Sequence, residues 1–192
     1  MSSRLDTRDF INVGIFTVIY FVVLFLTGML GIISPLSMFI GFTVGLLLNG
    51  TVVTLYLART PKMGALTLLS LLVGILLFLT GHPWIAPVVS TMAGFAGDVA
   101  FARLRGTWRV PVAYAFLSLL YLAPWMPMFY NSEAYFAYIA DEMGQDYADT
   151  LASFLQPWTL LLWAGILFVV ALIGGRIGVR IGRRSFARAG LA

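Results

Sequence analysis

The sequence predicts an all-α membrane protein with six transmembrane helices. The 192-residue chain is 60% hydrophobic and only 10% charged, whereas soluble domains contain about 25% charged residues. Apolar segments of about 20 residues recur along it, and each can cross a hydrocarbon core about 30 Å thick. We therefore expect residues 1–192 to form a single integral membrane domain with essentially no soluble part.

The six predicted spans follow one another with short connections. The first span is too long for a signal-peptide core and no small-residue cleavage site follows it, so we expect it to be retained. Cysteine is absent, which excludes disulfides and thiolate metal sites. The predicted spans are about 10–34, 36–57, 65–81, 84–101, 110–129 and 157–179.

Lysine and arginine fall on one side of this six-span arrangement. The connections between spans one and two and between spans three and four contain neither residue, and the connection between spans five and six contains five acidic residues. Because cytoplasmic loops carry an excess of basic residues, we expect both termini in the cytoplasm. The pI near 9.7 then reflects contact with anionic membrane lipid, and no nucleic acid is needed to explain it. The basic residues are Arg4, Arg8, Arg59, Lys62, Arg103, Arg105, Arg109, Arg176, Arg180, Arg183, Arg184 and Arg188.

Residues 131–156 form the only long polar stretch, and apolar side chains recur in it every four residues. This spacing predicts an extracellular amphipathic helix over about 132–155, with Gly144 as the point where it can break. Two interpretations stay open: a surface helix that rests on lipid, or a lid over a ligand. The repeating apolar positions are Tyr135, Ile139, Met143, Tyr147, Leu151 and Leu155.

Prolines disturb two helix ends on the predicted outer face. Pro124 and Pro127 lie in APWMPMFY at the end of the fifth span, and Pro83 and Pro87 lie around the start of the fourth. Broken helices are tolerated in membranes mainly where protein or a cavity surrounds them, and small-molecule sites are usually aromatic-lined hollows. We therefore predict a substrate cavity at this end. Its candidate binding residues are His82, Trp84, Trp125, Met126, Met128, Tyr130, Asn131 and Tyr135.

His82, in GHPW, is the only histidine. It either bonds water or a carbonyl at the membrane interface, or contacts the ligand. Because neutral imidazole is a common metal ligand and haem axial ligand, a haem-like or other metal-bearing aromatic substrate, with His82 as its metal ligand, is one hypothesis. A neutral or hydrophobic vitamin-like molecule is the other. The absence of Lys and Arg on this side counts against strongly anionic substrates.

Two polar residues lie within predicted spans. Asp98, in AGFAGDVAF, is the only acidic residue inside a predicted span, and such residues are functional candidates. Its position near the cytoplasmic end, close to Arg103 and Arg105, favours an ion pair or a helix-capping role. Asn49 either makes a hydrogen bond between helices or contacts a ligand, and the former is the more common role.

Glycines repeat every four residues at the end of the sixth span, at Gly174, Gly178 and Gly182. The spacing leaves one helix face without side chains, and another helix can approach closely there. We therefore assign these three glycines to partner docking.

The chain resembles the Trep_Strep family of bacterial membrane proteins over nearly its whole length. The resemblance rests on LYLARTPKMGALTL, GHPW, GFAGDVAF, MGQDYADTL and, most specifically, GGRIGVRIGRRSFARAGL. In that last stretch Phe186, Arg188, Ala189 and Gly190 match the family ending, and Ser185 stands where relatives tend to have histidine.

The resemblance implies a substrate-binding (S) component of an energy-coupling factor (ECF) transporter in the bacterial plasma membrane. It implies a six-helix bundle that captures substrate outside, a membrane partner called the T component, and two cytoplasmic ATPases. S components often carry A-x-x-x-A in the first helix for docking, and Gly14 and Val18 occupy the matching face here.

The alternative functions are a membrane-embedded enzyme or a stand-alone carrier that acts on a lipid-like or vitamin-like molecule. The chain has no phosphate-binding G-x-x-x-x-G-K-[ST] motif, no H-E-x-x-H zinc motif and no G-x-S-x-G elbow. We therefore expect a protein that is not an enzyme, requires no cofactor and takes its energy from a partner.

Overall fold

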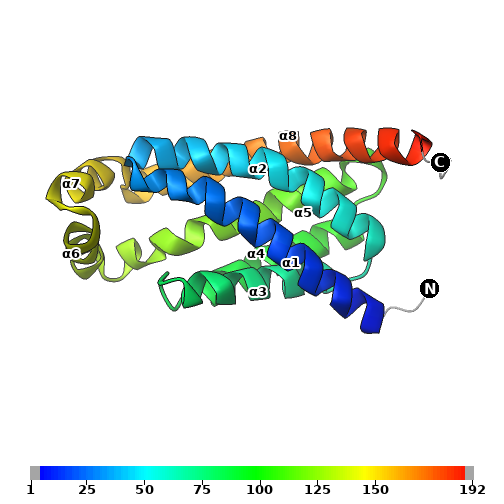
Figure 1. Ribbon diagram of the computed structural model, residues 1–192, viewed down its shortest axis with the longest axis horizontal. Helices are drawn as coiled ribbons and strands as arrows, with labels where there is room; N and C mark the ends of the chain where they lie inside the picture. The colour runs from blue at the N-terminus through cyan, green and yellow to red at the C-terminus, as the bar shows by residue number, and fades with distance from the viewer. Residues whose placement is uncertain (1–4, 189–192) are drawn as a thin grey trace.

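Each predicted span forms a helical segment along the length of an elongated bundle (Figure 1). The computed structural model describes residues 5–188, and within that range the chain is helical without strands. The α-helices at the six predicted spans are α1 (Thr7–Gly28), α2 (Pro35–Arg59), α3 (Ala65–Leu79), α4 (Ala86–Arg103), α5 (Arg109–Leu117) and α8 (Pro157–Arg188). Three 3₁₀ helices adjoin them: η1 (Met29–Ile32), η2 (Gly106–Trp108) and η3 (Ser118–Phe129).

Four segments of the described chain are long and apolar enough to cross a membrane: Thr7–Ile32, Pro35–Arg59, Gly106–Phe129 and Trp158–Arg183. The remaining two predicted spans correspond to α3 and α4. The 15 residues of α3 reach only about 22 Å at 1.5 Å per residue. The corner between α3 and α4 therefore lies nearer the middle of the bundle than α6 (Ser132–Met143) and α7 (Gln145–Phe154) (Figure 1).

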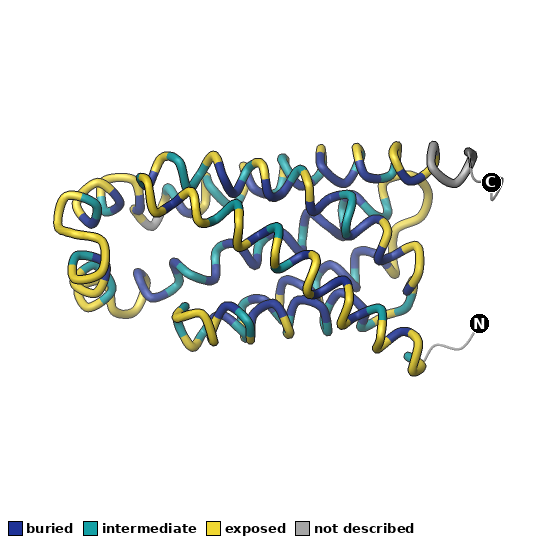
Figure 2. The backbone as a smooth tube through the Cα atoms, viewed as in Figure 1, coloured by how far each residue is buried: buried dark blue, intermediate teal, exposed yellow. Residues whose placement is uncertain are grey.

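Large apolar side chains cover the outside of the bundle. Val18 and Leu26 of α1 are 58% and 62% exposed, and Leu161 of α8 is 76% exposed. Exposed positions recur along both helices in Figure 2. A continuous apolar surface of this kind is unfavourable in water, whereas hydrocarbon accommodates it because the helices satisfy their own backbone groups. The outer surface therefore has the composition of a lipid-facing one.

The segment formed by α5 and η3 runs through the middle of the bundle (Figure 1) and is the most buried of the four candidate spans. Its second half is a 3₁₀ helix of 12 residues that contains Pro124 and Pro127. Proline has no N–H to donate and clashes with the preceding turn of an α-helix, which explains why the α-helix is not maintained. The prediction that proline disturbs this span is confirmed.

Glycines bring α2 and α8 into backbone contact. A Cβ atom added at Gly174 would lie 2.8 Å from the Leu46 carbonyl oxygen, and one at Gly178 would lie 2.5 Å from that of Gly50. The groove predicted for a partner helix is therefore filled by α2 of the same chain. This corrects the assigned role of Gly174 and Gly178, which pack the bundle internally, while Gly182 is buried beside the Thr54 methyl group.

Asp98 caps a neighbouring helix. Its carboxylate accepts hydrogen bonds from the backbone N–H groups of Leu66 (3.1 Å) and Thr67 (2.9 Å) and from the Thr67 hydroxyl (2.6 Å). These N–H groups belong to the first turn of α3, whose own N-cap is Gly64, which has no side chain to accept them. Of the two roles favoured by the sequence, the structure shows capping and no ion pair of Asp98 among the described residues.

Asn49 joins helices inside the bundle, as its sequence context favours. Its side-chain amide donates to the Tyr20 carbonyl oxygen at 3.2 Å and to the Tyr121 hydroxyl at 3.4 Å. It thereby links α2 to α1 and to η3. The residue is fully buried and is not among the residues that line the large cavity described below.

The polar helix pair α6 and α7 lies at one end of the bundle, and the start of α1 and the end of α8 lie at the other (Figure 1). At the latter end Lys62 bonds the carboxylates of Asp6 and Asp9. The predicted amphipathic helix over 132–155 is present and is broken at Gly144, whose φ is 91°. Glycine adopts this left-handed conformation without steric cost.

Replacing Gly178 by alanine should destabilise the protein, because the new methyl group would press on the Gly50 backbone. Overpacking of this kind costs about 1–3 kcal/mol, which lowers the midpoint of thermal unfolding by several degrees in a chain of this size. Gly165→Ala in the same helix is the control, since nothing lies within 4 Å of its added Cβ. Unfolding in detergent, followed by size-exclusion chromatography after heating, measures both variants. Equal midpoints would contradict the α2–α8 contact.

Candidate functional site

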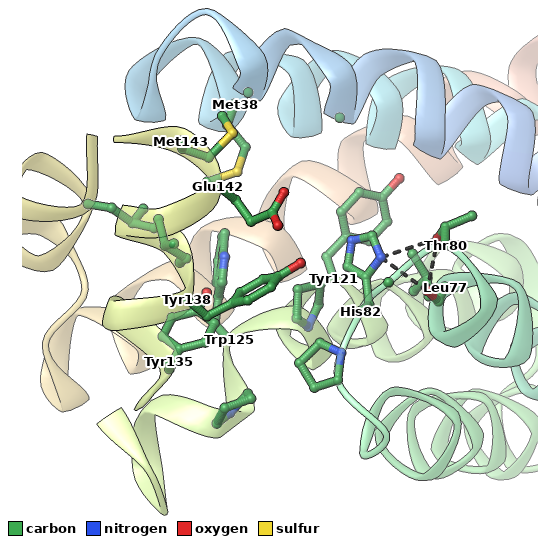
Figure 3. Close-up of a pocket in the computed structure, with 18 of the residues that line it drawn as sticks. Met38, Leu77, Thr80, His82, Tyr121, Trp125, Tyr135, Tyr138, Glu142 and Met143 are labelled. Atoms are coloured by element: carbon green, nitrogen blue, oxygen red, sulfur yellow. Dashed lines mark hydrogen bonds between the residues drawn. The ribbon is translucent and has the colours of Figure 1, made fainter. Parts of the chain in front are cut away.

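A cavity of about 770 Å³ lies at the end of the bundle that carries α6 and α7. Small-molecule sites usually measure about 300–1,000 Å³. Its walls come from the ends of α1 and α2 with η1, the α3–α4 corner, η3, and the α6–α7 pair. The short α3 leaves the corner recessed, and the α6–α7 pair covers the space above it (Figure 3).

Six of the eight predicted binding residues line this cavity, and Met126 and Met128 do not. In η3 the cavity wall is formed by Leu120, Tyr121, Pro124, Trp125 and Pro127. Met128 is instead buried in the hydrophobic core of the bundle, and Met126 is not among the lining residues. The predicted residues that line the cavity are His82, Trp84, Trp125, Tyr130, Asn131 and Tyr135.

The hydrogen bonds of His82 determine its tautomer. The Nδ1 atom lies 3.1 Å from the Leu77 carbonyl oxygen and 3.2 Å from the Thr80 hydroxyl. A carbonyl oxygen only accepts hydrogen bonds, so Nδ1 carries the proton and Nε2 is left with a lone pair. Partial burial in the loop lowers the pKa of His82, against a smaller opposing effect of the Leu77 carbonyl, so the ring is neutral at pH 7.

Aromatic rings form the floor and the rim of the cavity. Trp125 is 2% exposed, and its ring centroid lies 5.5 Å from that of Phe39, 5.9 Å from that of Phe42 and 6.2 Å from that of Trp163. This cluster holds the floor rigid. At the rim, Trp84 is 64% exposed and pairs with Tyr130 at 6.5 Å.

The apolar stripe of the α6–α7 pair faces the cavity, which favours the lid interpretation over a helix that only rests on lipid. The Tyr147 hydroxyl donates to the Gly31 carbonyl oxygen at 2.9 Å, and this bond ties α7 to η1 across the cavity. Burial raises the pKa of Tyr147, so the hydroxyl keeps its proton. The stripe residues that line the cavity are Tyr135, Ile139, Met143, Tyr147 and Leu151.

Sequence reasoning missed several residues of the wall. Met29, Met38 and Met143 bring thioether sulfurs to the cavity in place of the two methionines predicted from η3. Glu142 also lines the cavity. Helical periodicity could have predicted this position, because Glu142 lies seven residues after Tyr135 and therefore on the same helix face. Nothing in the local sequence pointed to Met29 and Met38, which reach the site through packing of distant segments.

Within residues 5–188, no group of three or more His, Asp or Glu side chains gathers as a metal site. His82 is the cavity residue suited to metal coordination, because a bonded Nδ1–H is the arrangement that usually orients Nε2 toward a metal. The side chains of Met38 and Met143 lie on the opposite wall of the cavity (Figure 3).

Comparison with known families gives one match: residues 7–188 match the family described as "hypothetical bacterial integral membrane protein (Trep_Strep)". The chain belongs to the Trep_Strep family. No curated protein and no solved structure matches it. The family description places the Trep_Strep protein in a membrane and names no substrate.

Removing the Tyr147 hydroxyl should loosen the α6–α7 pair. Tyr147→Phe keeps the ring but loses the bond to Gly31, which is worth about 1 kcal/mol, so deuterium exchange in α7 should accelerate about fivefold. Tyr138→Phe is the matched control, because Tyr138 lines the same cavity and its hydroxyl makes no hydrogen bond within the described residues. Mass spectrometry of peptides from Gln145–Phe154 measures the effect, and identical exchange in both variants would contradict this role.

Proposed function

We propose that this Trep_Strep protein is the substrate-binding component of an energy-coupling factor importer. It captures a small aromatic or hydrophobic nutrient on the outer face of the bacterial plasma membrane. The observation that carries this proposal is the aromatic-walled cavity of about 770 Å³, covered by the α6–α7 pair. A binding site of this size in a chain without an ATP-binding motif fits a capture subunit that depends on partners for energy.

The proposed topology has six spans with both termini in the cytoplasm. In support, α1, α2, α3, α4, the α5–η3 segment and α8 run along the bundle in alternating directions (Figure 1). The connection formed by α6 and α7 carries five acidic residues and no Lys or Arg. By the positive-inside rule this end faces outward, and the cavity then opens toward external substrate.

The proposed docking surface for the T component is the exposed face of α1 around Gly14 and Val18. Nothing lies within 4 Å of a Cβ added at Gly14, and Val18 is 58% exposed. A flat helix face with a glycine allows a partner helix to approach closely. This surface is therefore open to a partner, in contrast to the Gly174 and Gly178 positions that α2 fills.

The narrower hypothesis of a haem-like or metal-bearing guest depends on His82. Its Nε2 lone pair is available among the described residues, and the ring borders the cavity (Figure 3). The walls are aromatic, as a planar macrocycle requires for stacking. Carboxylates on such a guest would find no Lys or Arg among the lining residues, which restricts this hypothesis to rings with few or shielded carboxylates.

Affinity purification of the tagged chain from its own bacterium tests the function. A second membrane protein and two ATPases should co-purify, and Gly14→Leu should reduce their recovery at least fivefold by blocking close approach on α1. Gly165→Leu is the control, since it also adds a side chain to an exposed, uncrowded helix position and should leave recovery unchanged. Purification of the intact chain without ATPases would instead favour a membrane-embedded enzyme or a stand-alone carrier.

Titration with haemin tests the metal-bearing guest. Axial ligation by Nε2 of His82 predicts a change in the Soret band on binding, and His82→Ala should abolish it. The imidazole bonds only the Leu77 carbonyl and the Thr80 hydroxyl, so the variant should still fold. An unchanged spectrum with both proteins would reject haem as the guest and leave the capture of metal-free rings untouched.

A further inference from the structure

The residues that line the cavity include one acidic side chain, and it is Glu142. In Figure 3 this carboxylate points from α6 into the cavity, toward the side that His82 borders. It makes no hydrogen bond and no ion pair within the part of the chain that the structure describes. A charged group that faces a ligand cavity without a protein partner is available to pair with the ligand.

The imidazole of His82 gives the cavity a further hydrogen-bond acceptor. Because the Nδ1–H is committed to the Leu77 carbonyl oxygen, the ring offers Nε2 as a lone pair. No Lys or Arg side chain is among the lining residues. Glu142 and His82 therefore both favour a guest that donates hydrogen bonds or carries positive charge.

The aromatic walls favour the same kind of guest. Aromatic ring faces carry negative partial charge and attract cations, with quaternary ammonium groups among the ligands recognised in this way. Tyrosine and tryptophan rings surround the space next to Glu142, and four of them are labelled in Figure 3. The aromatic lining residues are Phe25, Phe42, Trp84, Tyr121, Trp125, Tyr130, Tyr135, Tyr138 and Tyr147.

The distribution of charge along the bundle acts in the same direction. Residues 131–156 contain five acidic side chains and no Lys or Arg, and all twelve basic residues of the chain lie outside this segment. A surface of one sign near a low-dielectric opening raises the local concentration of ligands of the opposite sign. Anions are disfavoured at this end before they reach the cavity.

We propose that the cavity binds an organic cation, a protonated or quaternary amine on an aromatic or hydrophobic body, with Glu142 as its charge partner. The ammonium group lies between the Glu142 carboxylate and the tyrosine rings, and the apolar body fills the space above Trp125. This inference rests on the capture function proposed above and specifies the chemical class of its substrate.

Three naphthalene probes of equal body and different charge test the charge preference: (1-naphthylmethyl)trimethylammonium, 1-naphthylacetate and 1-naphthalenemethanol. The full chain is purified in an uncharged maltoside detergent, which carries neither an ammonium group nor an anionic group that would bind the probes. Isothermal titration calorimetry then gives the Kd of each probe for the unmodified protein, for Glu142→Gln and for Asp141→Asn. Asp141→Asn is the matched control, because this substitution removes an acidic side chain from the neighbouring position, and Asp141 does not line the cavity.

The ammonium probe should bind at least tenfold more tightly than the carboxylate and the alcohol. Glu142→Gln should raise its Kd about tenfold, the size expected for loss of one charge-assisted contact, while Asp141→Asn should change it less than twofold. Tighter binding of the carboxylate or alcohol, absence of binding by all three probes, or an unchanged Kd in Glu142→Gln would overturn the proposal. If only the cation proposal is wrong, ATPases will still co-purify with the chain. If the proposed capture function is wrong, no ATPases will co-purify.

Discussion

The backbone of the central segment Arg109–Phe129 must be kept away from lipid, and the rest of the bundle depends on this constraint. Pro124 and Pro127 cannot donate backbone hydrogen bonds, and carbonyl groups left without partners are costly in hydrocarbon. The segment is accordingly surrounded by other helices along most of its length. Its central position then places the 3₁₀ face of Tyr121, Pro124 and Pro127 at the base of the cavity.

Surrounding one broken segment requires the outer helices to pack closely, and small residues allow it. Gly174 and Gly178 let α8 touch the backbone of α2, and Gly94 brings α4 against the Leu66 and Ser70 positions of α3. Polar contacts then fix the register of the helices, because Asp98 caps α3 from α4. Side-chain hydrogen bonds of this kind join helices inside a bilayer, and here they favour one arrangement among helices that are otherwise similarly apolar.

The sequence predicted most of the secondary structure because hydrophobic length and proline act locally. Helices occur at all six predicted ranges, and the broken amphipathic pair at Gly144 was visible in the four-residue spacing. The last helix continues to Arg188 rather than ending near 179, and beyond the apolar stretch Gly182 still packs beside Thr54 of α2. The glycine spacing predicted close helix approach correctly but could not show that the approaching helix belongs to the same chain.

The sequence predicted the site residues that lie at helix ends or on the four-residue stripe of α6. It missed the residues that only the packing of distant segments brings to the cavity. His82, Trp84 and Tyr135 follow from their positions at helix ends or on the α6 stripe. Met126 and Met128 were placed in the site by proximity to Pro127, but neither lines the cavity, and Met128 packs in the buried core. Met29 and Met38 come from the other side of the bundle, and only tertiary packing brings them to the cavity.

Topology and ligand chemistry are connected in a membrane protein with short loops. In the orientation proposed here, the rule that retains Lys and Arg in the cytoplasm also removes them from the outer connections. A cavity built from those connections has neutral and acidic groups to offer, as Glu142 and the tyrosines do. Recognition of an anion would require a basic residue on the outer side of the membrane. Such a residue would oppose the positive-inside rule that orients the chain. A cation needs no such exception, so in the proposed orientation the charge asymmetry that directs insertion would also favour a cationic guest.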